Sequence, residues 1–395
     1  LALVVRGRDA HGGGRHRGEV RAVRALFYYQ LLDLFGRIPL VIEAETNAKL
    51  MKQSARSEVF RFVVNELQTA LPYLSEEHSN LLGNNYGHMT KSVAYFLLAR
   101  LALNAEVYSD DDWTDKLKQD GTKIYFQVGG QSLNAWQTTM AYCDSLTEIG
   151  YSLEKNYVDN FVVSNEHSRE NIFTIPMDKT LYATVFKNLF RTLHYVHGGA
   201  LGRGAENGSS ATLSTLSTFG YRTPHQDPRF EFNFFADTVK VDDKVVMINK
   251  TTPLVYHPLS IKMQLTGAKY EKTAGARMKK YEIDRTAYDD GKLQNNDIVL
   301  YRYADALLMQ SEAMIRQGRN GDVPLNMVRA RVGLSPLRNA TLTDVLKERM
   351  LELVWEGTRR QDLIRFHLFH LPYEERPQLA KEINAYTTVF PIPLR

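Results

Sequence analysis

The sequence predicts a mainly α-helical fold that carries one long irregular region and a few short strands. Near the C-terminus, residues 341–366 repeat apolar side chains at the spacing of a helix with one buried stripe. Several stretches between residues 18 and 150 show a similar pattern and are separated by short turns. Residues 179–227, in contrast, are rich in Gly, Ser, Thr and Tyr. So long a segment without regular structure is uncommon in a compact domain unless it is functional or disordered.

The composition is that of a soluble globular protein. Of 395 residues, 44% are hydrophobic and 24% are charged. No run approaches the roughly 18 apolar residues of a membrane-spanning helix. The 21 Tyr, 18 Phe and 3 Trp would suit a carbohydrate-binding surface, because sugar rings stack on aromatic faces. Large cores also use Tyr and Phe, so we assign most of these aromatic residues to the core.

The charge and the cysteine content argue against a nucleic-acid-binding protein and against a protein stabilised by internal disulfides. Most of the formal net charge of +4 lies in the first 17 residues, which hold four arginines against Asp9 alone. The rest of the chain is close to neutral, so we expect no nucleic-acid partner. The one cysteine, Cys143, excludes an internal disulfide, and its place on a predicted helix indicates a buried, inert thiol.

Helix signals divide the first 150 residues into four segments. The first helix ends at Gly36 and Pro39, and the second is capped by Ser57 and stops before Pro72. After the irregular region, the helices resume at Ile298. The four predicted helices span residues 18–35, 57–71, 90–108 and 133–149.

Strand signals are short. Residues 123–128 alternate enough to form a strand, which Gly129 and Gly130 follow as a turn. Residues 170–175 end in another short strand, whereas residues 239–249 and 269–282 are strands or loops.

The C-terminal helical stretch carries an unusual row of carboxylates. Glu348, Glu352 and Glu356 follow one another at intervals of four residues, so they would lie on one helix face and repel one another unless cations reach them. Gly357 disfavours a helix interior and predicts a break or a close helix approach. The nearest candidate cations in sequence are Arg349, Arg359 and Arg365.

Five stretches, in order, resemble the motifs of the SusD/RagB family. The most specific is residues 348–363, which follow the pattern ER..EL..EG.R..DL. The others are residues 21–40 (RAVRALFYYQLLDLFGRIPL), 90–108 (TKSVAYFLLARLALNAEVY), 301–313 with 325–334 (YRYADALLMQSEA and LNMVRARVGL), and 390–393 (FPIP). The resemblance runs from about residue 18 to the end, and residues 1–17 form an atypical segment.

The resemblance implies a single domain over residues 18–395. Residues 18–150 would be a SusD-like scaffold of degenerate tetratricopeptide-type helix pairs, residues 151–297 a loop-rich ligand region, and residues 298–395 a C-terminal helical part. Members of the family are surface nutrient-binding lipoproteins of Bacteroidetes. Such proteins carry a lipoprotein signal and an acylated N-terminal Cys, and this sequence shows neither. We therefore expect contact with the membrane only through a lipid anchor that lies outside this sequence.

The resemblance also implies a function. We expect a protein on the outer face of the outer membrane that captures a nutrient, most often a glycan, above a SusC-like TonB-dependent transporter. Two alternatives remain open. The ligand would be an oligopeptide, as for relatives of the RagB type, or the helical repeats would only cap the transporter without a ligand of their own.

No motif indicates an enzyme. The sequence has no G-x-S-x-G, H-E-x-x-H, C-x-x-C or P-loop, so we expect neither catalysis nor a cofactor. Two histidine pairs have a spacing that could place both rings on one metal, but neither has an obvious third ligand nearby. Ordinary packing or surface histidines are favoured, and no metal is expected. The pairs are His194 with His197 and His367 with His370.

An acidic loop surrounds one tryptophan, within a segment (residues 109–132) that looks like an insertion between helices. Asp110, Asp111, Asp112 and Asp115 could hold Ca²⁺, but a solvated acidic turn is favoured. Trp113 is either an anchor folded back into the protein or an exposed stacking platform, and the two interpretations stay open. Trp136 and Trp355 lie on helical patterns, which predicts core positions.

The long irregular region supplies the main candidates for ligand binding. Glycan sites combine flat aromatic faces with planar polar groups that bond to vicinal hydroxyls, and this region has both. The same tyrosines could instead pin the loop to the scaffold. The predicted ligand-binding residues are Tyr182, Tyr195, Tyr221, Arg191 and His194, with Trp113 as an outside candidate.

Overall fold

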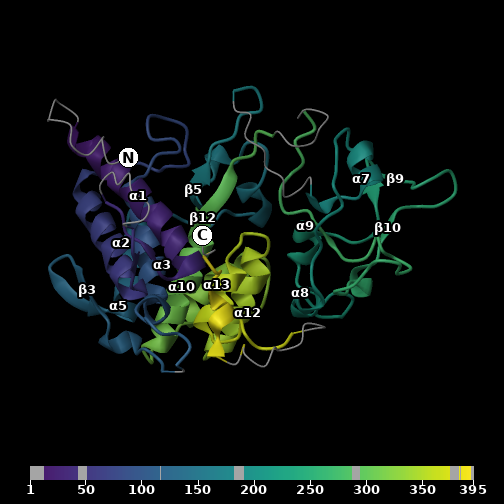
Figure 1. The fold of residues 1–395 in the computed structure, drawn as a ribbon. Coiled ribbons are helices and arrows are strands. Elements are labelled where there is room, and N and C mark those ends of the chain that lie inside the picture. Colours follow the sequence, from purple (N-terminus) through teal and green to yellow (C-terminus); the bar gives the residue numbers. More distant parts are fainter. Residues whose placement is uncertain are drawn as a thin grey trace.

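A computed structural model describes residues 13–42, 51–115, 117–181, 191–286, 294–373, 382 and 384–392. Figure 1 shows the helices gathered in one part of the molecule, with the segment that carries α7, α8, α9, β9 and β10 beside them. We call these the helical part and the loop-rich part. The predicted mainly α fold is confirmed.

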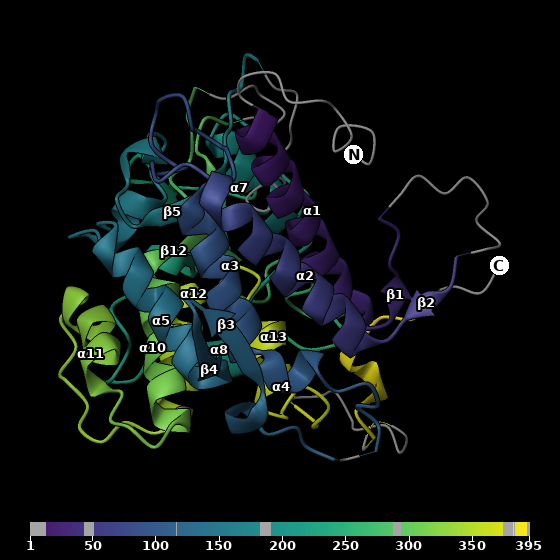
Figure 2. The ribbon, with the colours of Figure 1, turned by 90° about the vertical axis from the view of Figure 1, so that its left-hand side faces the viewer.

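Consecutive helices pack on one another through the helical part. Helix α1 (Gly13–Phe35) packs on α2 (Arg56–Ala70), and α3 (Lys91–Leu103) packs on α5 (Ala135–Glu148). Helix α5 in turn packs on α10 (Tyr303–Arg316). Figure 2 shows these five helices side by side. No helix in the part of the chain that the structure describes is both long and apolar enough to cross a membrane.

The beginning of α2 differs from the prediction. Its N-cap residue is Ala55, so the prediction that Ser57 caps this helix was wrong. Asp111, from the acidic loop, accepts hydrogen bonds from the backbone nitrogen and the hydroxyl of Ser57 at 2.8 and 2.9 Å. A carboxylate 54 residues away therefore satisfies a free amide of the first turn.

The predicted third helix is divided, and the insertion after it contains a hairpin. Helix α3 ends at Leu103, and α4 (Ala105–Tyr108) begins after a single residue, Asn104. The hairpin pairs β3 (Tyr125–Val128) with β4 (Gln131–Asn134). Gly129 and Gly130 at its turn have φ angles of 56° and 82°, which confirms the predicted strand and turn.

Two strands that lie far apart in the sequence pair with each other. The predicted short strand is confirmed as β5 (Asn171–Ile175), which pairs antiparallel with β12 (Ile298–Arg302). The expectation that helices resume at Ile298 was wrong, because α10 begins only at Tyr303. The β-branched pair Ile298–Val299 fits a strand, and an apolar run this short does not distinguish the two structures.

The loop-rich part consists of short elements around small cores. The aromatic residues Phe219, Phe230 and Phe234 form one such core. Its helices are α7 (Tyr195–Ala200), α8 (Leu213–Thr218) and α9 (Phe230–Asn233). Its strands are β6 (Phe234–Phe235), β7 (Asp237–Thr238), β8 (Lys240–Val241), β9 (Lys244–Val245), β10 (Val255–Tyr256) and β11 (Arg277–Met278).

The remaining helices confirm the predicted break near the C-terminus. Helix α11 (Asp322–Arg331) and α12 (Leu342–Leu353) pack on α10, and α13 (Arg359–Arg365) follows α12 after five residues without helical structure. Gly357 lies in that break with φ 76°, a backbone conformation that favours glycine.

Trp136 and Cys143 lie as predicted, whereas the prediction that Trp355 lies on a helix was wrong. Trp136 and Cys143 are buried in the main core. Trp355 lies in the break after α12 with φ 69°, is only partly buried, and donates a hydrogen bond from Nε1 to the carbonyl of Asn233.

The carboxylate row is compensated, but not by the predicted arginines. Glu348 and Glu352 lie on α12, Glu356 lies beyond its end, and all three are buried. Arg349 and Arg365 instead bind Asp305, Asp362 and Glu312, and Arg359 donates to the carbonyl of Leu346. The cations that reach the row are Arg229, Lys280, Arg302, Arg329 and Arg331.

One strand (β12), two loops and α11 therefore converge on this carboxylate row. Neighbours in sequence point to other sides of a helix, whereas cations from distant segments reach the buried face. The row ties the loop-rich part to the helical part, because Arg229 comes from the former and Glu352 from the latter.

Candidate functional site

A cleft of about 520 Å³ opens between α4, the inserted segment, α13 and the last residues that the structure describes. We call it the Trp113 cleft. Its walls combine one tryptophan with many polar side chains. The described residues that line it are Arg56, Glu106, Val107, Asp110, Trp113, Leu117, Lys118, Gln119, Arg316, Ile364, Arg365, His367, His370, Asn384, Ala385 and Thr388.

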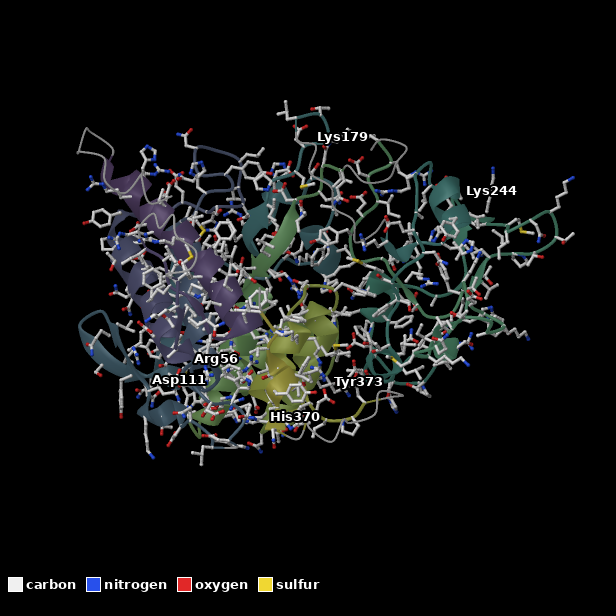
Figure 3. All side chains as sticks on the ribbon, in the orientation of Figure 1. Arg56, Asp111, Lys179, Lys244, His370 and Tyr373 are labelled. Carbon is white, nitrogen blue, oxygen red and sulfur yellow. The ribbon has the colours of Figure 1, made fainter. Side chains whose placement is uncertain are left out.

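Figure 3 labels Arg56, Asp111 and His370 at this end of the helical part. The acidic loop is fastened there at two points. Asp111 binds the start of α2 through Ser57, and its carbonyl accepts a hydrogen bond from Arg37. These contacts hold Trp113, two residues later, at the mouth of the cleft.

Trp113 is partly anchored and partly open to the cleft. One edge of its indole lies on Gly36, where an added Cβ would come within 3.0 Å of the ring. Gly36 also has φ 69°, so both its backbone and its lack of a side chain suit this contact. Trp113 is half-buried and lines the cleft. Part of its ring therefore anchors the loop, and another part faces the cleft, where it could serve as a stacking platform.

Two guanidinium groups accompany the indole. The carbon centre of the Arg56 guanidinium lies 5.0 Å from the Trp113 ring centre, and that of Arg37 lies 5.2 Å from it. Both distances allow cation–π attraction. Arg37 is exposed, whereas Arg56 is 1% exposed.

The acidic loop satisfies much of its own hydrogen bonding. Asp112 accepts from the backbone and hydroxyl of Thr114, and Asp110 accepts from the backbone of Asp112. Burial raises the pKa of Asp110. Among the described residues, no group of three His, Cys, Asp or Glu side chains lies in an arrangement that could hold a metal ion.

The histidine pairs lie in different surroundings. His367 and His370 line the Trp113 cleft, and burial lowers the pKa of His367. His194 and His197 are buried in the loop-rich part, where His197 lies within 3.1 Å of the Tyr256 hydroxyl. Burial, with a smaller contribution from His194, lowers the pKa of His197 to about 4, so its ring is neutral at neutral pH.

A second cleft, of about 660 Å³, lies between α8 and the α12–α13 segment. We call it the Trp355 cleft. Its walls are more apolar than those of the Trp113 cleft. Its apolar lining residues are Ala211, Met350, Leu353, Val354, Trp355, Leu363, Leu368, Phe369, Leu371, Pro372 and Tyr373.

Those predicted ligand-binding residues of the irregular region that the structure describes line neither the Trp113 cleft nor the Trp355 cleft. Tyr182 lies outside the described residues. Tyr195 is 53% exposed at the start of α7, and Arg191 is exposed and paired with Glu206 at 3.5 Å. His194 is buried, and its Nδ1 accepts a hydrogen bond from the backbone of Val196 at 3.3 Å, so it caps α7.

Tyr221 has the surroundings of a structural residue. Its ring stacks on Phe230 with 4.9 Å between centroids, and Arg222 lies over the ring at 5.3 Å. Its hydroxyl donates to the Asp237 carboxylate at 2.8–2.9 Å. Burial and this carboxylate raise its pKa to about 12. These contacts favour the alternative in which Tyr221 pins the loop to the scaffold.

Arg56, Arg316 and the α13 side chains of the Trp113 cleft were not predicted. They come from segments far apart in sequence, and no motif links them. The one local feature of the sequence that pointed to this cleft was a tryptophan in a polar, Asp-rich insertion. It identified Trp113 but not the other residues that line the cleft.

Two protein-family models match the chain. The model described as "SusD family" matches residues 117–391, and the one described as "Starch-binding associating with outer membrane" matches residues 13–103. The second match begins where α1 begins, so residues 13–17, which the sequence-based division placed in the atypical segment, continue that helix.

Named relatives agree with these matches. The chain is 22% identical to "Starch-binding protein SusD" of Bacteroides thetaiotaomicron over 96% of its own length, and 24% identical to a "SusD-like protein" of Bacteroides ovatus over 88%. It spans 70% of the first relative's length and 58% of the second's.

Solved structures share the fold. A "Laminarin binding SusD-like protein" aligns with a TM-score of 0.65 at 18% identity, over 98% of this chain and 76% of that one. "Surface glycan-binding protein A" of Bacteroides thetaiotaomicron, in complex with laminarihexaose, aligns with a TM-score of 0.64 at 19% identity, over 93% and 72%. At these identities the likeness establishes the fold.

Proposed function

The chain belongs to the SusD family, and on that premise we propose that it binds a glycan at the cell surface and delivers it to a TonB-dependent transporter of the outer membrane. A binding role, without catalysis, agrees with the names of the relatives, which are binding proteins. An N-terminal lipid anchor outside this sequence would hold the protein at the membrane. The outer-membrane description of the second family model supports this location.

The observation that carries the proposal is the Trp113 cleft. It places a half-buried indole beside amide, imidazole, hydroxyl and charged groups. Sugars present one apolar ring face and an edge of hydroxyls, so an aromatic face flanked by directional polar groups suits them. A volume of about 520 Å³ is within the range of small-molecule sites.

The exposed Tyr195 and Arg191 form a second, shallower candidate surface for the same ligand. Neither residue lines the Trp113 cleft or the Trp355 cleft, so a glycan bound there would keep more of its surface in water. We therefore propose Trp113 as the principal platform and Tyr195 as an accessory one.

An oligopeptide is the second candidate ligand. The apolar walls of the Trp355 cleft, with Arg359 and Arg360 also lining it, would suit an extended peptide with apolar side chains and a terminal carboxylate. In a third possibility, the helical part only caps the transporter and binds no small ligand.

Isothermal titration calorimetry against a panel of oligosaccharides and oligopeptides separates the three proposals. We expect heat with one class of oligosaccharide. Heat with peptides alone would replace the glycan with the peptide ligand. Absence of heat with every member of both panels would favour the capping role.

A further inference from the structure

We propose that the Trp113 cleft selects an acidic glycan, whose carboxylate or sulfate group accepts hydrogen bonds from the buried guanidinium of Arg56. This inference rests on the glycan-binding function proposed above. In this proposal, Arg56 is the residue that distinguishes an acidic glycan from a neutral one.

Arg56 differs from the other deeply buried arginines. Four arginines are among the largest fully buried side chains of the described residues. Three of them are held by carboxylates: Arg229 by Asp227, Glu348 and Glu352, Arg302 by Glu170, Glu352 and Glu356, and Arg365 by Glu312 and Asp362. The fourth is Arg56, whose side chain makes no ion pair or hydrogen bond with the described part of the chain.

The pKa of Arg56 also shifts in the opposite direction from the pKa values of the other three arginines. Although burial alone would lower them, neighbouring carboxylates raise the pKa values of Arg229, Arg302 and Arg365. For Arg56, burial dominates and lowers the pKa, because the electrostatic interactions with Tyr108, Asp33 and Asp110 offset only part of the desolvation. A buried guanidinium without a close anion is energetically costly.

The guanidinium is nevertheless oriented by its surroundings. It lies 5.0 Å from the Trp113 ring centre and 5.7 Å from that of Tyr108. Its Nε is buried without a hydrogen-bond partner among the described residues, and the side chain lines the cleft. The two ring contacts orient the guanidinium at the wall of the cleft, where the acidic group of the proposed ligand would reach it.

Three carboxylates, Asp33 near Arg56 and Asp110 and Glu106 in the cleft wall, already have other hydrogen-bond partners. Asp33 accepts from Tyr108 and Arg360 outside the cleft wall, and Asp110 accepts from the backbone of Asp112. Glu106 accepts from the backbone of Gly121 at 2.9 Å and lies 3.8 Å from Arg316.

Among the described lining residues, the cationic side chains of Arg56, Lys118, Arg316 and Arg365 outnumber the carboxylates of Glu106 and Asp110. Arg316 and Arg365 are both bound to Glu312, so the positive charge that a ligand would meet comes mainly from Arg56 and Lys118. A planar guanidinium can donate two parallel hydrogen bonds to a carboxylate, and such charge-assisted bonds are short and strong. Since the indole lies beside the same guanidinium, a sugar ring could stack on Trp113 while its acidic group reaches Arg56.

The opposing interpretation is that stacking on Trp113 and Tyr108 is sufficient for Arg56, and that the cleft takes neutral sugars. The two interpretations differ in one property that can be changed on the ligand without altering the protein. Methyl esterification of a uronate keeps the sugar, its linkage and most of its shape, but removes the charge.

The test titrates the whole chain with oligouronates, their methyl esters, sulfated oligosaccharides and neutral oligosaccharides. We expect the free acid, or a sulfated sugar, to bind at least about tenfold more tightly than its uncharged counterpart, as the strength of charge-assisted hydrogen bonds implies. Tighter binding of the oligouronates would indicate a carboxylate ligand, and tighter binding of the sulfated oligosaccharides would indicate a sulfate ligand. Equal affinities for charged and uncharged partners, or binding of neutral sugars only, would overturn the acidic-glycan inference and leave the glycan-binding function intact. Absence of binding in all arms would overturn both.

Two variants assign the selectivity to Arg56. Arg56→Gln should reduce the affinity for the acid to that for the ester and leave the ester affinity close to that of the unaltered protein. Arg37→Gln is the matched control, because Arg37 approaches the same indole from the exposed side. It should change the acid and ester affinities by the same factor. If Arg56→Gln unfolds, the acid–ester comparison on the unaltered protein still decides the inference.

Discussion

The guanidinium Nη1 of Arg302 lies 2.5 Å from Oε1 of Glu352, and both side chains are fully buried although 50 residues separate them in the chain. Arg302 ends the strand β12, and Glu352 lies in the last turn of α12. Arg229 from the loop-rich part binds the other oxygen of the same carboxylate at 2.9 Å. Glu352 therefore joins three segments, and its ionised form is part of the fold.

Substitution of Glu352 by alanine should destabilise the protein strongly. Arg229, Arg302 and Arg331 would each lose a buried carboxylate partner. Breaking a buried ion pair by removing one partner costs about 3–5 kcal/mol. Urea unfolding measures the loss, and Glu76→Ala is the matched control, because Glu76 pairs with Lys91 at the surface and its removal should leave the midpoint in place. A midpoint for Glu352→Ala equal to that of the control would contradict the role assigned to Glu352.

Local patterns predicted the helices and the β3–β4 hairpin, because apolar spacing and a Gly–Gly turn are properties of adjacent residues. They could not identify which cations compensate Glu348 and Glu352, since these come from β12, α11 and the loop-rich part. The same limit explains the missed cap at α2, where Asp111 arrives from a distant loop. The candidate site, the Trp113 cleft, also combines a residue with a local signal and a residue without one. Trp113 was recognisable from its local composition, whereas Arg56 became part of the site only through folding.

Acid should weaken the fold through Glu312. Although burial alone would raise its pKa, the neighbouring Arg365 and Arg316 lower it from 4.5 to about 2. A carboxylate with a depressed folded-state pKa stabilises the fold above pH 4.5, and this contribution is lost as the pH falls toward 2. We expect unfolding free energies, measured in urea at pH 7, 5, 4 and 3, to be level down to about pH 5 and then to fall by about 1–3 kcal/mol for this group. In Glu312→Gln the fall should be smaller. A profile with the same slope in the variant would show that other groups control acid unfolding.

The break after α12 depends on Gly357. Its φ of 76° is a conformation that other residues rarely adopt, and no atom lies within 4 Å of a Cβ built there. Gly357→Ala should therefore cost about 1 kcal/mol through backbone strain alone. Gly199→Ala is the control, because Gly199 also has open space around it but lacks the positive φ. Thermal unfolding of both variants checks the difference, and equal melting temperatures would show that the break tolerates a side chain.

The two described tyrosines of the irregular region should behave differently from each other. Tyr221→Ala removes a ring stacked on Phe230 and a hydroxyl bound to Asp237, so it should lower the melting temperature. Tyr195→Ala removes an exposed ring and should leave the melting temperature unchanged. Affinity measured on the folded variants then shows whether Tyr195 is an accessory platform. A stable Tyr221→Ala variant with weakened binding would instead assign ligand contact to Tyr221.

The account depends most on the position of the glycan, and calorimetric titration of Trp113→Ala tests this most directly. The oligosaccharide that gives heat with the unaltered protein is titrated into Trp113→Ala and Tyr195→Ala, with melting temperatures recorded for both. We expect Trp113→Ala to stay folded and to bind more weakly by about 1–3 kcal/mol, by analogy with the loss of aromatic stacking on a nucleic-acid base. Tyr195→Ala should have the smaller effect. A folded Trp113→Ala variant that binds as tightly as the unaltered protein would contradict the account and place the glycan outside the Trp113 cleft.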